Sequence, residues 1–485
     1  MHLMGIDVGS STVKVAVYDE EMHLIRVVER SYAVKNCGED RCETPVETVW
    51  TLVCAAIQEA ATGLDVSAIS ATSFGEAAIP VDQAGCVLHD NILYTDRRGE
   101  EAFAQIVHDI GADQIYATTG AQPHPMYSVY KMAWLLKNAP KAMERVSAFH
   151  QMADFILRRL GARPHMDASL CARTQAFDVI HKKWSAAVIA AAGLDESLLP
   201  EAVASGTVVG QVPARLAESL NLSKRCLLVA GGHDQPCMAL GTGAVRSGLA
   251  SDGMGTVECI VPVADHPTMN EQMRKANFAC APHVLPDKYV TFAFNQCAGA
   301  LVNWYRQVFL NDGQSFSDMF NDMADDACGL MMTPYFTGAA TPRMDPNACG
   351  ALVGLKIDHG RAHILRALAE GMNYEMMLNV QCLRRAGFLI DRLTAAGGLS
   401  RSSRLMQLKA NMMGLPVAVS DMEHAGCKGT ALLAGQALGL FDAAAMALHT
   451  MKIKHTYLPD AIEHARYAER LADYASLYER TCGFR

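Results

Sequence analysis

The sequence has little of what marks a membrane or secreted protein. Its longest uncharged run, Tyr289 to Tyr305, covers 17 residues and includes Asn295 and Asn303, so it is too short and too polar to span a bilayer. No basic segment precedes an apolar stretch at the N-terminus, where Asp7 interrupts the few apolar residues. We therefore expect neither a signal peptide nor a membrane segment.

Paired cysteines and concentrated basic charge are also scarce. The 15 cysteines are scattered singly, and the nearest pair, Cys37 and Cys42, is not completed by a second pair or a CxxH sequence, so reduced thiols and a cytoplasmic location are expected. The 42 Lys and Arg residues are outnumbered by 51 Asp and Glu residues, which gives a net charge of -9, and no segment gathers basic residues. Nucleic acid is not an expected partner.

What the chain does have is length and apolar residues. With 485 residues, of which 50% are hydrophobic and 19% charged, it can form about two or three folded domains. Two standard nucleotide-binding motifs are missing, because no GxxxxGK[ST] segment occurs and Gly241 and Gly243 lack the third glycine of GxGxxG. The sequence therefore lacks the main motifs that would indicate a P-loop kinase or a dinucleotide dehydrogenase.

The beginning of the chain has the pattern of an α/β fold. Period-two alternation broken by turns predicts an antiparallel meander of three strands, Leu3 to Val8, Thr12 to Tyr18 and Leu24 to Val34. An amphipathic helix is predicted from Pro45 to Gly63, and a further strand from Val66 to Ala71.

The later chain repeats this pattern after a mainly helical middle. Leu249 to Val257 again places an acidic residue, glycines and a hydroxyl residue between two β-like stretches, as Asp7 to Ser11 does. This indicates an internal duplication, with a domain boundary near residue 245. Other predicted elements are helices at Ser128 to Lys137, Gln151 to Leu160, Gly360 to Ala386 and Lys428 to Leu440, and strands at Arg225 to Ala230 and Leu393 to Ala396.

The loop from Asp7 to Lys14 brings together groups that bind phosphate. It places a carboxylate at a strand end, then Gly9, Ser10 and Ser11, then a lysine on the returning strand. The carboxylate can hold Mg²⁺ through water, the loop N–H and hydroxyl groups can bind phosphoryl oxygens, and the lysine can neutralise them.

Three other acidic side chains can be explained by structural roles alone. Asp234 can cap a helix that begins near Pro236. Glu76 can be a solvated loop carboxylate. Asp96 can form an ordinary surface pair with Arg97.

Taken in order, these motifs resemble the FGGY carbohydrate kinases, a family of the actin and hexokinase-like ATPase superfamily. The similarity extends over about residues 3 to 440. The matching segments are Asp7 to Lys14 (first phosphate loop), Thr72 to Glu76 (sugar-contacting turn), Tyr94 to Arg98 (W-x-D-x-R segment), Gly231 to Gln235 (catalytic loop), Gly255-Thr256 (second phosphate loop), Pro342-Arg343, Gly350 and Gly354-Leu355 (C-terminal signature), and Gly397 to Ser400 with Gln407 and Gly414 to Val417 (adenosine loop and helix).

The resemblance implies a fold, an activity and a set of site residues. It implies two RNase H-like α/β domains, 1–245 mainly for the sugar and 246–485 mainly for the nucleotide, which close on a cleft. It implies ATP and Mg²⁺ as cofactors and a small sugar or polyol as acceptor, a pentulose such as xylulose being favoured. The implied roles are catalytic base for Asp234, metal ligand for Asp7, phosphate and ATP binding for Gly9, Ser10, Ser11, Lys14, Gly255, Thr256, Gly397, Gly398 and Ser400, and acceptor binding for Gly75, Glu76, Asp96, Met126, Asp234 and Gln235.

Some residues depart from the family pattern. Val257 follows the second phosphate loop where serine or glycine is frequent, and Leu399 replaces an alanine in the adenosine loop. Gly75-Glu76 matches neither the Arg-Glu of glycerol kinases nor the Met-His of xylulokinases. A non-catalytic sugar or nucleotide sensor is the alternative reading, and a homodimer is the default expectation for the oligomeric state.

Overall fold

The structure is a computed structural model that describes every residue except 39–40, 311–315, 422–423 and 484–485. The chain forms two compact units. Unit 1 comprises Met1–Val245, Cys280–Val290 and His424–Thr450, and unit 2 comprises Arg246–Ala279, Thr291–Glu423 and Met451–Arg485. The sequence predicts one domain boundary, near residue 245. In the structure, the chain passes between the two units there and at four later points.

Unit 1 is built on one mixed sheet with the strand order β14-β15-β6-β1-β2-β3. The predicted meander is confirmed, since β1, β2 and β3 pair antiparallel, and β6 and β15 then run parallel to β1. The strands are β1 (His2–Val8), β2 (Thr12–Tyr18), β3 (Leu24–Ser31), β6 (Val66–Ser73), β14 (Val208–Gln211) and β15 (Leu227–His233).

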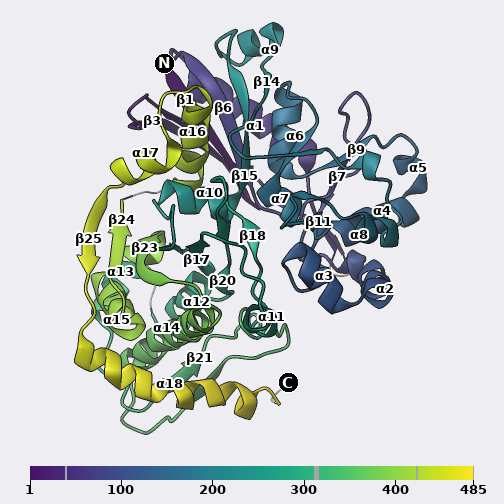
Figure 1. The fold of residues 1–485 in the computed structure, drawn as a ribbon. Helices are drawn as coiled ribbons and strands as arrows, with labels where there is room; N and C mark the ends of the chain where they lie inside the picture. The colour runs from purple at the N-terminus through teal and green to yellow at the C-terminus, as the bar shows by residue number, and fades with distance from the viewer. Residues whose placement is uncertain (39–40, 311–315, 422–423, 484–485) are drawn as a thin grey trace. The chain divides into compact units, whose positions relative to one another are not determined.

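Helices cover this sheet, and one of them comes from the far end of the sequence. The predicted first helix is confirmed as α1 (Val46–Ala61), which packs on β2 and β3. Helix α16 (Ala425–Ala437) lies against β1 and β6 (Figure 1). It packs this closely because Gly5 has no side chain, and an added Cβ would lie 1.9 Å from the carbonyl oxygen of Cys427.

The middle of unit 1 is less helical than its sequence indicates, because short strands alternate with the helices. The remaining elements are β4 (Lys35–Gly38), β5 (Arg41–Thr44), β7 (Ile79–Val81), β8 (Asn91–Ile92), η1 (Arg97–Gly99), α2 (Glu100–Ile110), α3 (Ala112–Thr119), α4 (Ser128–Asn138), α5 (Pro140–Met143), β9 (Ala148–His150), α6 (Met152–Leu160), β10 (His165–Asp167), α7 (Ala168–Ala172), β11 (Phe177–Asp178), β12 (Lys183–Trp184), α8 (Ala186–Ala191), η2 (Glu196–Leu198), β13 (Glu201–Val203), α9 (Ala214–Ser219), α10 (Asp234–Gly241), β18 (Ala281–Pro282), β19 (Tyr289–Val290) and α17 (Ala443–His449).

Unit 2 repeats the strand arrangement of unit 1, so the predicted duplication is confirmed. Three strands pair antiparallel in the order β20-β17-β16, and β23 and β24 continue the sheet parallel to β16, with β25 antiparallel at the edge. These strands are β16 (Gly248–Met254), β17 (Glu258–Ala264), β20 (Ala293–Asn295), β23 (Ile390–Ala396), β24 (Val417–Ser420) and β25 (Ile453–Tyr457).

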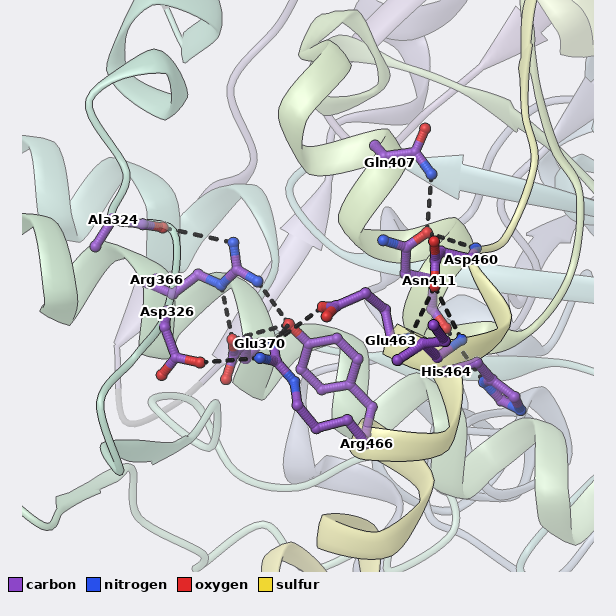
Figure 2. A network of polar contacts seen from close by, with 12 residues as sticks. Ala324, Asp326, Arg366, Glu370, Gln407, Asn411, Asp460, Glu463, His464 and Arg466 are labelled. Atoms are coloured by element: carbon purple, nitrogen blue, oxygen red, sulfur yellow. Dashed lines mark hydrogen bonds and ion pairs between the residues drawn. The ribbon is translucent and has the colours of Figure 1, made fainter.

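A polar network ties the C-terminal helix of unit 2 to its neighbours. Arg366 donates from its Nε to Glu370 at 2.7 Å (Figure 2) and from its Nη2 to the hydroxyl of Tyr467 at 2.5 Å. The other elements of unit 2 are α11 (Glu271–Lys275), α12 (Gly299–Phe309), α13 (Phe316–Asn321), β21 (Met331–Thr333), β22 (Ala351–Val353), α14 (Arg361–Arg385), η3 (Gly398–Arg401), α15 (Ser403–Met413) and α18 (Ala461–Thr481). Among the described residues, no helix combines the length and apolarity that a membrane crossing requires.

Candidate active site

The first phosphate-binding candidate lies on the β1–β2 hairpin of unit 1. The backbone pairing places Asp7 directly opposite Lys14. Burial raises the pKa of Asp7 to about 6, while the charge of Lys14 acts to lower it and that of Glu29 to raise it. The carboxylate also faces α16, since a Cβ added to Gly426 would lie 2.8 Å from Asp7 Oδ2. A carboxyl group and a lysine therefore lie side by side at the loop, as the sequence predicts.

Two tyrosines shape the loop between these strands. The Tyr32 hydroxyl donates to the carbonyl of Gly9 at 2.5 Å, and the Tyr32 N–H donates to the carbonyl of Ser11 at 2.9 Å. The side chain of Ser10 is hydrogen-bonded to Tyr94. Because two of its carbonyls are bound from one side, the loop has a fixed shape.

Asp234 lies where β15 passes into α10. The helix begins at Asp234 itself, with His233 as its N-cap residue, so the alternative in which Asp234 caps a helix starting near Pro236 is wrong. His233 Nε2 is 3.1 Å from Asp234 Oδ1, and the Asp234 side chain is 31% exposed. Its carboxylate can therefore be reached by a substrate while one side contacts the protein.

The surroundings of Asp234 adjust its basicity. Burial raises its pKa to about 7, and the neighbouring charges of Asp7 and Glu76 raise it further than Arg173 lowers it. The pKa of His233 is held well below its usual range by burial and by Arg173, so this imidazole is neutral. A carboxyl group that titrates near neutral pH is suited to general base catalysis.

Glu76 is neither solvated nor alone. It is 5% exposed, and its Oε1 accepts from Arg173 Nε at 2.6 Å and also pairs with Arg173 Nη2. The Arg173 guanidinium lies over the ring of Tyr127, 5.1 Å from its centroid. Burial acts to lower the pKa of Arg173, but the charges of Glu76, Tyr127 and Asp234 and the hydrogen bond to Glu76 together raise it, so the guanidinium stays ionised. The solvated-carboxylate alternative is therefore wrong.

The backbone at this turn is built around that ion pair. Glu76 has φ +62, a left-handed conformation that is uncommon for a residue with a side chain. A Cβ on Gly75 would lie 2.7 Å from Arg173 Cγ and 3.2 Å from His233 Cδ2. Gly75 therefore leaves space for Arg173 and His233, and its predicted contact with the acceptor stays a prediction.

A half-buried rim adjoins the pair. His124 and Met126 are partly exposed, and the buried Lys131 donates to the carbonyl of Met126 at 2.6 Å. Burial lowers the pKa of Lys131 to about 7, against the charges of Glu76 and Asp96, which raise it. The predicted acceptor residue Met126 is thus held in place by a lysine that the sequence did not single out.

Asp96 is a structural residue in this arrangement. Its side chain is 0% exposed and binds Arg98 Nη2 at 2.7 Å and the N–H of Cys42 at 2.8 Å. Asp96 therefore holds the loop, and its predicted contact with the acceptor stays a prediction. The alternative surface pair is also wrong, since Arg97 binds Glu100 at 2.6 Å.

Gln235 follows Asp234 directly in the chain, as part of the same helix. It lies in the first turn of α10, and its buried Oε1 has no hydrogen-bond partner within the described residues. A buried acceptor of this kind is suited to a hydroxyl of a bound molecule.

In unit 2, the glycines of the two predicted nucleotide loops are exposed to solvent. Gly255, Thr256, Gly397 and Gly398 are exposed, whereas Ser400 is 5% exposed and donates its hydroxyl to the carbonyl of Gly397 at 2.8 Å. The Ser400 hydroxyl is therefore used within the loop.

The two residues that depart from the family pattern also differ in exposure. Leu399 is buried, so this departure concerns packing, whereas Val257 is 47% exposed beside the second phosphate loop.

Buried charges support these loops. Lys409 of α15 binds Asp252 of β16 at 3.0 Å and also Glu258 of β17, and all three side chains are buried. Gln407 on the same helix donates to Asn411 at 2.8 Å (Figure 2). It also donates to the carbonyl of Leu458 at 2.8 Å. Gln407 therefore holds the segment that leads into α18.

The donor set of unit 1 suits a magnesium ion bound mainly by phosphate. No cluster of three or more His, Cys, Asp or Glu side chains arranged for a metal occurs among the described residues. Asp7 supplies one carboxylate, and it raises the pKa of Asp234 by repulsion. A nearby cation would relieve that repulsion, and Mg²⁺ commonly uses one or two carboxylates with waters and phosphate oxygens.

Arg173 and Lys131 lie outside the motifs of the sequence, and His233 lies inside the matched segment Gly231 to Gln235 without a predicted role. Arg173 is 97 positions from Glu76, and no local pattern links them. The only signal was Gly75 itself, a small residue that leaves space which another side chain has to fill.

Comparison with known proteins agrees with this geometry. The models of the FGGY family of carbohydrate kinases match residues 2–241 (N-terminal domain) and 253–438 (C-terminal domain). A xylulose kinase of Staphylococcus epidermidis is 26% identical over 99% of this chain and 97% of its own, and a glycerol kinase of Methylibium petroleiphilum is 27% identical over 99% of both.

A solved structure shows the same fold. The gluconate kinase from Lactobacillus acidophilus superposes with a TM-score of 0.92 at 22% identity, covering 100% of this chain and 98% of that one. The expected fold of two RNase H-like units is confirmed. Because the two family models together span most of the sequence, the chain belongs to the FGGY family of carbohydrate kinases and is an ATP-dependent kinase of a sugar or polyol.

Proposed function

We propose that the protein transfers the γ-phosphoryl group of ATP to a hydroxyl of a pentulose, with Asp234 as the general base. The observation that carries this proposal is the environment of Asp234, a partly exposed carboxyl group with a pKa near 7 next to the Glu76–Arg173 pair. In this mechanism Asp234 takes the proton of the acceptor hydroxyl as that oxygen attacks phosphorus.

The remaining side chains of unit 1 orient the reactants. The second carboxylate oxygen of Glu76 and Oε1 of Gln235 accept hydrogen bonds from acceptor hydroxyls. Ser10, Ser11 and Lys14 bind and neutralise phosphoryl oxygens, and Asp7 is the proposed Mg²⁺ ligand. When bound, the metal supplies charge neutralisation at the phosphoryl oxygens. Gly255, Thr256, Gly397 and Gly398 are the proposed nucleotide contacts of unit 2.

A pentulose is proposed as acceptor because the Staphylococcus epidermidis relative is named xylulose kinase. A coupled assay of ADP release over pentuloses, hexuloses, polyols and aldonates tests this. We expect the highest kcat/KM with a pentulose. A higher kcat/KM with glycerol or an aldonate would contradict the proposed pentulose acceptor but leave the proposed phosphoryl transfer standing. Binding of ATP and sugars without acceptor-dependent ADP release would instead favour the sensor function.

A further inference from the structure

Helix α7, only one and a half turns long, begins with an unusually well-bonded cap. Asp167 precedes it, and its Oδ1 accepts from the N–H groups of Ser169 at 2.8 Å and Leu170 at 3.1 Å. The hydroxyls of Ser169 and Ser205 also donate to this carboxylate. Burial raises the pKa of Asp167 to about 6, against these hydrogen bonds, which lower it. A buried carboxylate with four donors fixes the position of the helix firmly.

The same serine reaches the catalytic loop. While its hydroxyl donates to Asp167, the oxygen of Ser169 accepts the N–H of His233 at 2.8 Å. Contact here is direct, because a Cβ on Gly232 would lie 2.8 Å from Ser169 Oγ and 3.2 Å from Asp167 Oδ1. His233 is the residue before the proposed base Asp234, so Ser169 fixes the backbone from which Asp234 extends.

One helical turn later, the same element reaches the acceptor side of the site. Arg173 follows Ser169 by four residues and is the C-cap residue of α7, in helical conformation. Residues four apart lie on the same side of a helix. Arg173 there binds Glu76, and its Cβ and Cγ occupy the space left by Gly75. One short helix thus holds both the proposed base and the proposed acceptor-binding carboxylate.

We propose that Asp167 and Ser169 are positioning residues, which set the distance between Asp234 and the Glu76–Arg173 pair through α7. This inference rests on the proposed function and adds to it two residues that touch neither substrate. A purely structural role would predict a loss of stability with unchanged kinetics. A positioning role predicts a loss in kcat, because a base displaced by a fraction of an ångström transfers its proton less well.

The test is Ser169→Ala, with Ser185→Ala as the matched control. Ser185 caps α8, and its Oγ accepts from the Val188 N–H at 3.5 Å, so the control also loses a capping serine in unit 1. We expect Ser169→Ala to lower kcat about 10- to 100-fold with the KM for ATP within about twofold of wild type. Ser169→Thr, which keeps the hydroxyl, should recover most of the loss. Ser185→Ala should leave kcat unchanged.

A second measurement does not depend on turnover. Amide hydrogen exchange at His233 should be faster in Ser169→Ala, because its N–H has lost its acceptor, and unchanged in Ser185→Ala. If Ser169→Ala folds with wild-type kcat, or if its exchange at His233 equals that of wild type, the positioning role is wrong. If Ser169→Ala does not fold, the same two measurements are made on Asp167→Asn, because this change keeps the size of the side chain and weakens the cap. The same outcomes then support or overturn the positioning role. Failure of the wild-type enzyme to phosphorylate any acceptor would overturn the proposed function and leave the exchange result standing.

Discussion

Asp234 is the residue on which the chemistry depends most. Asn has nearly the same shape but cannot accept the proton of the acceptor hydroxyl. We therefore expect Asp234→Asn to lower kcat about 10²- to 10⁴-fold, the usual contribution of a positioned base, while calorimetric affinity for ATP stays near wild type. Turnover close to wild type, measured with the acceptor that the screen identifies, would overturn this assignment.

The raised pKa values of Asp7 and Asp234 also predict how stability depends on pH. Their folded pKa values, about 6 and about 7, lie above the unfolded value of about 4, so the stability they contribute is fully present below pH 4 and lost as pH rises to 7. Asp234→Asn removes one of these carboxylates. The Tm difference between this variant and wild type should therefore become more positive between pH 4 and pH 7.5. The control is Asp473→Asn, which makes the same exchange of carboxylate for amide at an exposed position of α18.

Variants of the Glu76–Arg173 pair distinguish an effect on acceptor binding from an effect on stability. Glu76→Ala removes a charged hydrogen-bond acceptor, which costs about 1.5 to 3 kcal/mol, so the KM for the acceptor should rise about 10- to 100-fold. It also leaves Arg173 buried without its carboxylate, so Tm should fall. In Glu76→Ala/Arg173→Met, Tm should recover while KM stays high. Recovery of both would show that Glu76 acts only in folding.

At the scale of single residues, the sequence predicted the groups that belong to local motifs. Asp7 and Lys14 lie on β1 and β2, and Glu76, Asp234 and Gln235 follow β6 and β15 of the same sheet. What the sequence could not predict was pairing across distance. Asp96 belongs to a matched motif, but its bonds to Arg98 and to the Cys42 N–H were not predicted.

At the scale of elements, the adenosine loop depends on one glycine. Gly397 has φ +114, and a Cβ there would lie 2.5 Å from the carbonyl oxygen of Met254. Gly397→Ala should therefore displace η3 and weaken binding of a non-hydrolysable ATP analogue, measured by calorimetry, by about tenfold or more. The control is Gly360→Ala, where an added Cβ meets nothing within 4 Å. Equal analogue affinity in both variants would remove Gly397 from the proposed nucleotide site.

Strands and long helices with regular periodicity were predictable as elements. The meander, α1, α14 and the repeated β hairpin follow from alternation or 3.6-residue spacing, and the structure confirms them. The short strands of unit 1, such as β10 and β13 with three residues each, were missed. Elements of that length have too few residues for a period to be visible, and only tertiary pairing defines them.

At the scale of the whole molecule, the sequence did not show which segments return to unit 1. Residues 280–290 and 424–450 follow the boundary predicted at 245 but pack with the first unit. Their association depends on close contacts such as that of Gly5 with α16, which involve residues from opposite ends of the chain. No local pattern carries that information.

The last prediction concerns both units together. The proposed phosphate contacts Ser10 and Lys14 belong to unit 1, whereas Gly255 and Thr256 belong to unit 2. If one γ-phosphoryl group is bound by both sets, it links the two units, so binding of ATP and acceptor together should favour a more compact form. Small-angle scattering with a non-hydrolysable ATP analogue and the acceptor should show a smaller radius of gyration with both ligands than with neither, and a smaller change with the acceptor alone. Identical curves in all three states would mean that the phosphate contacts do not come from both units.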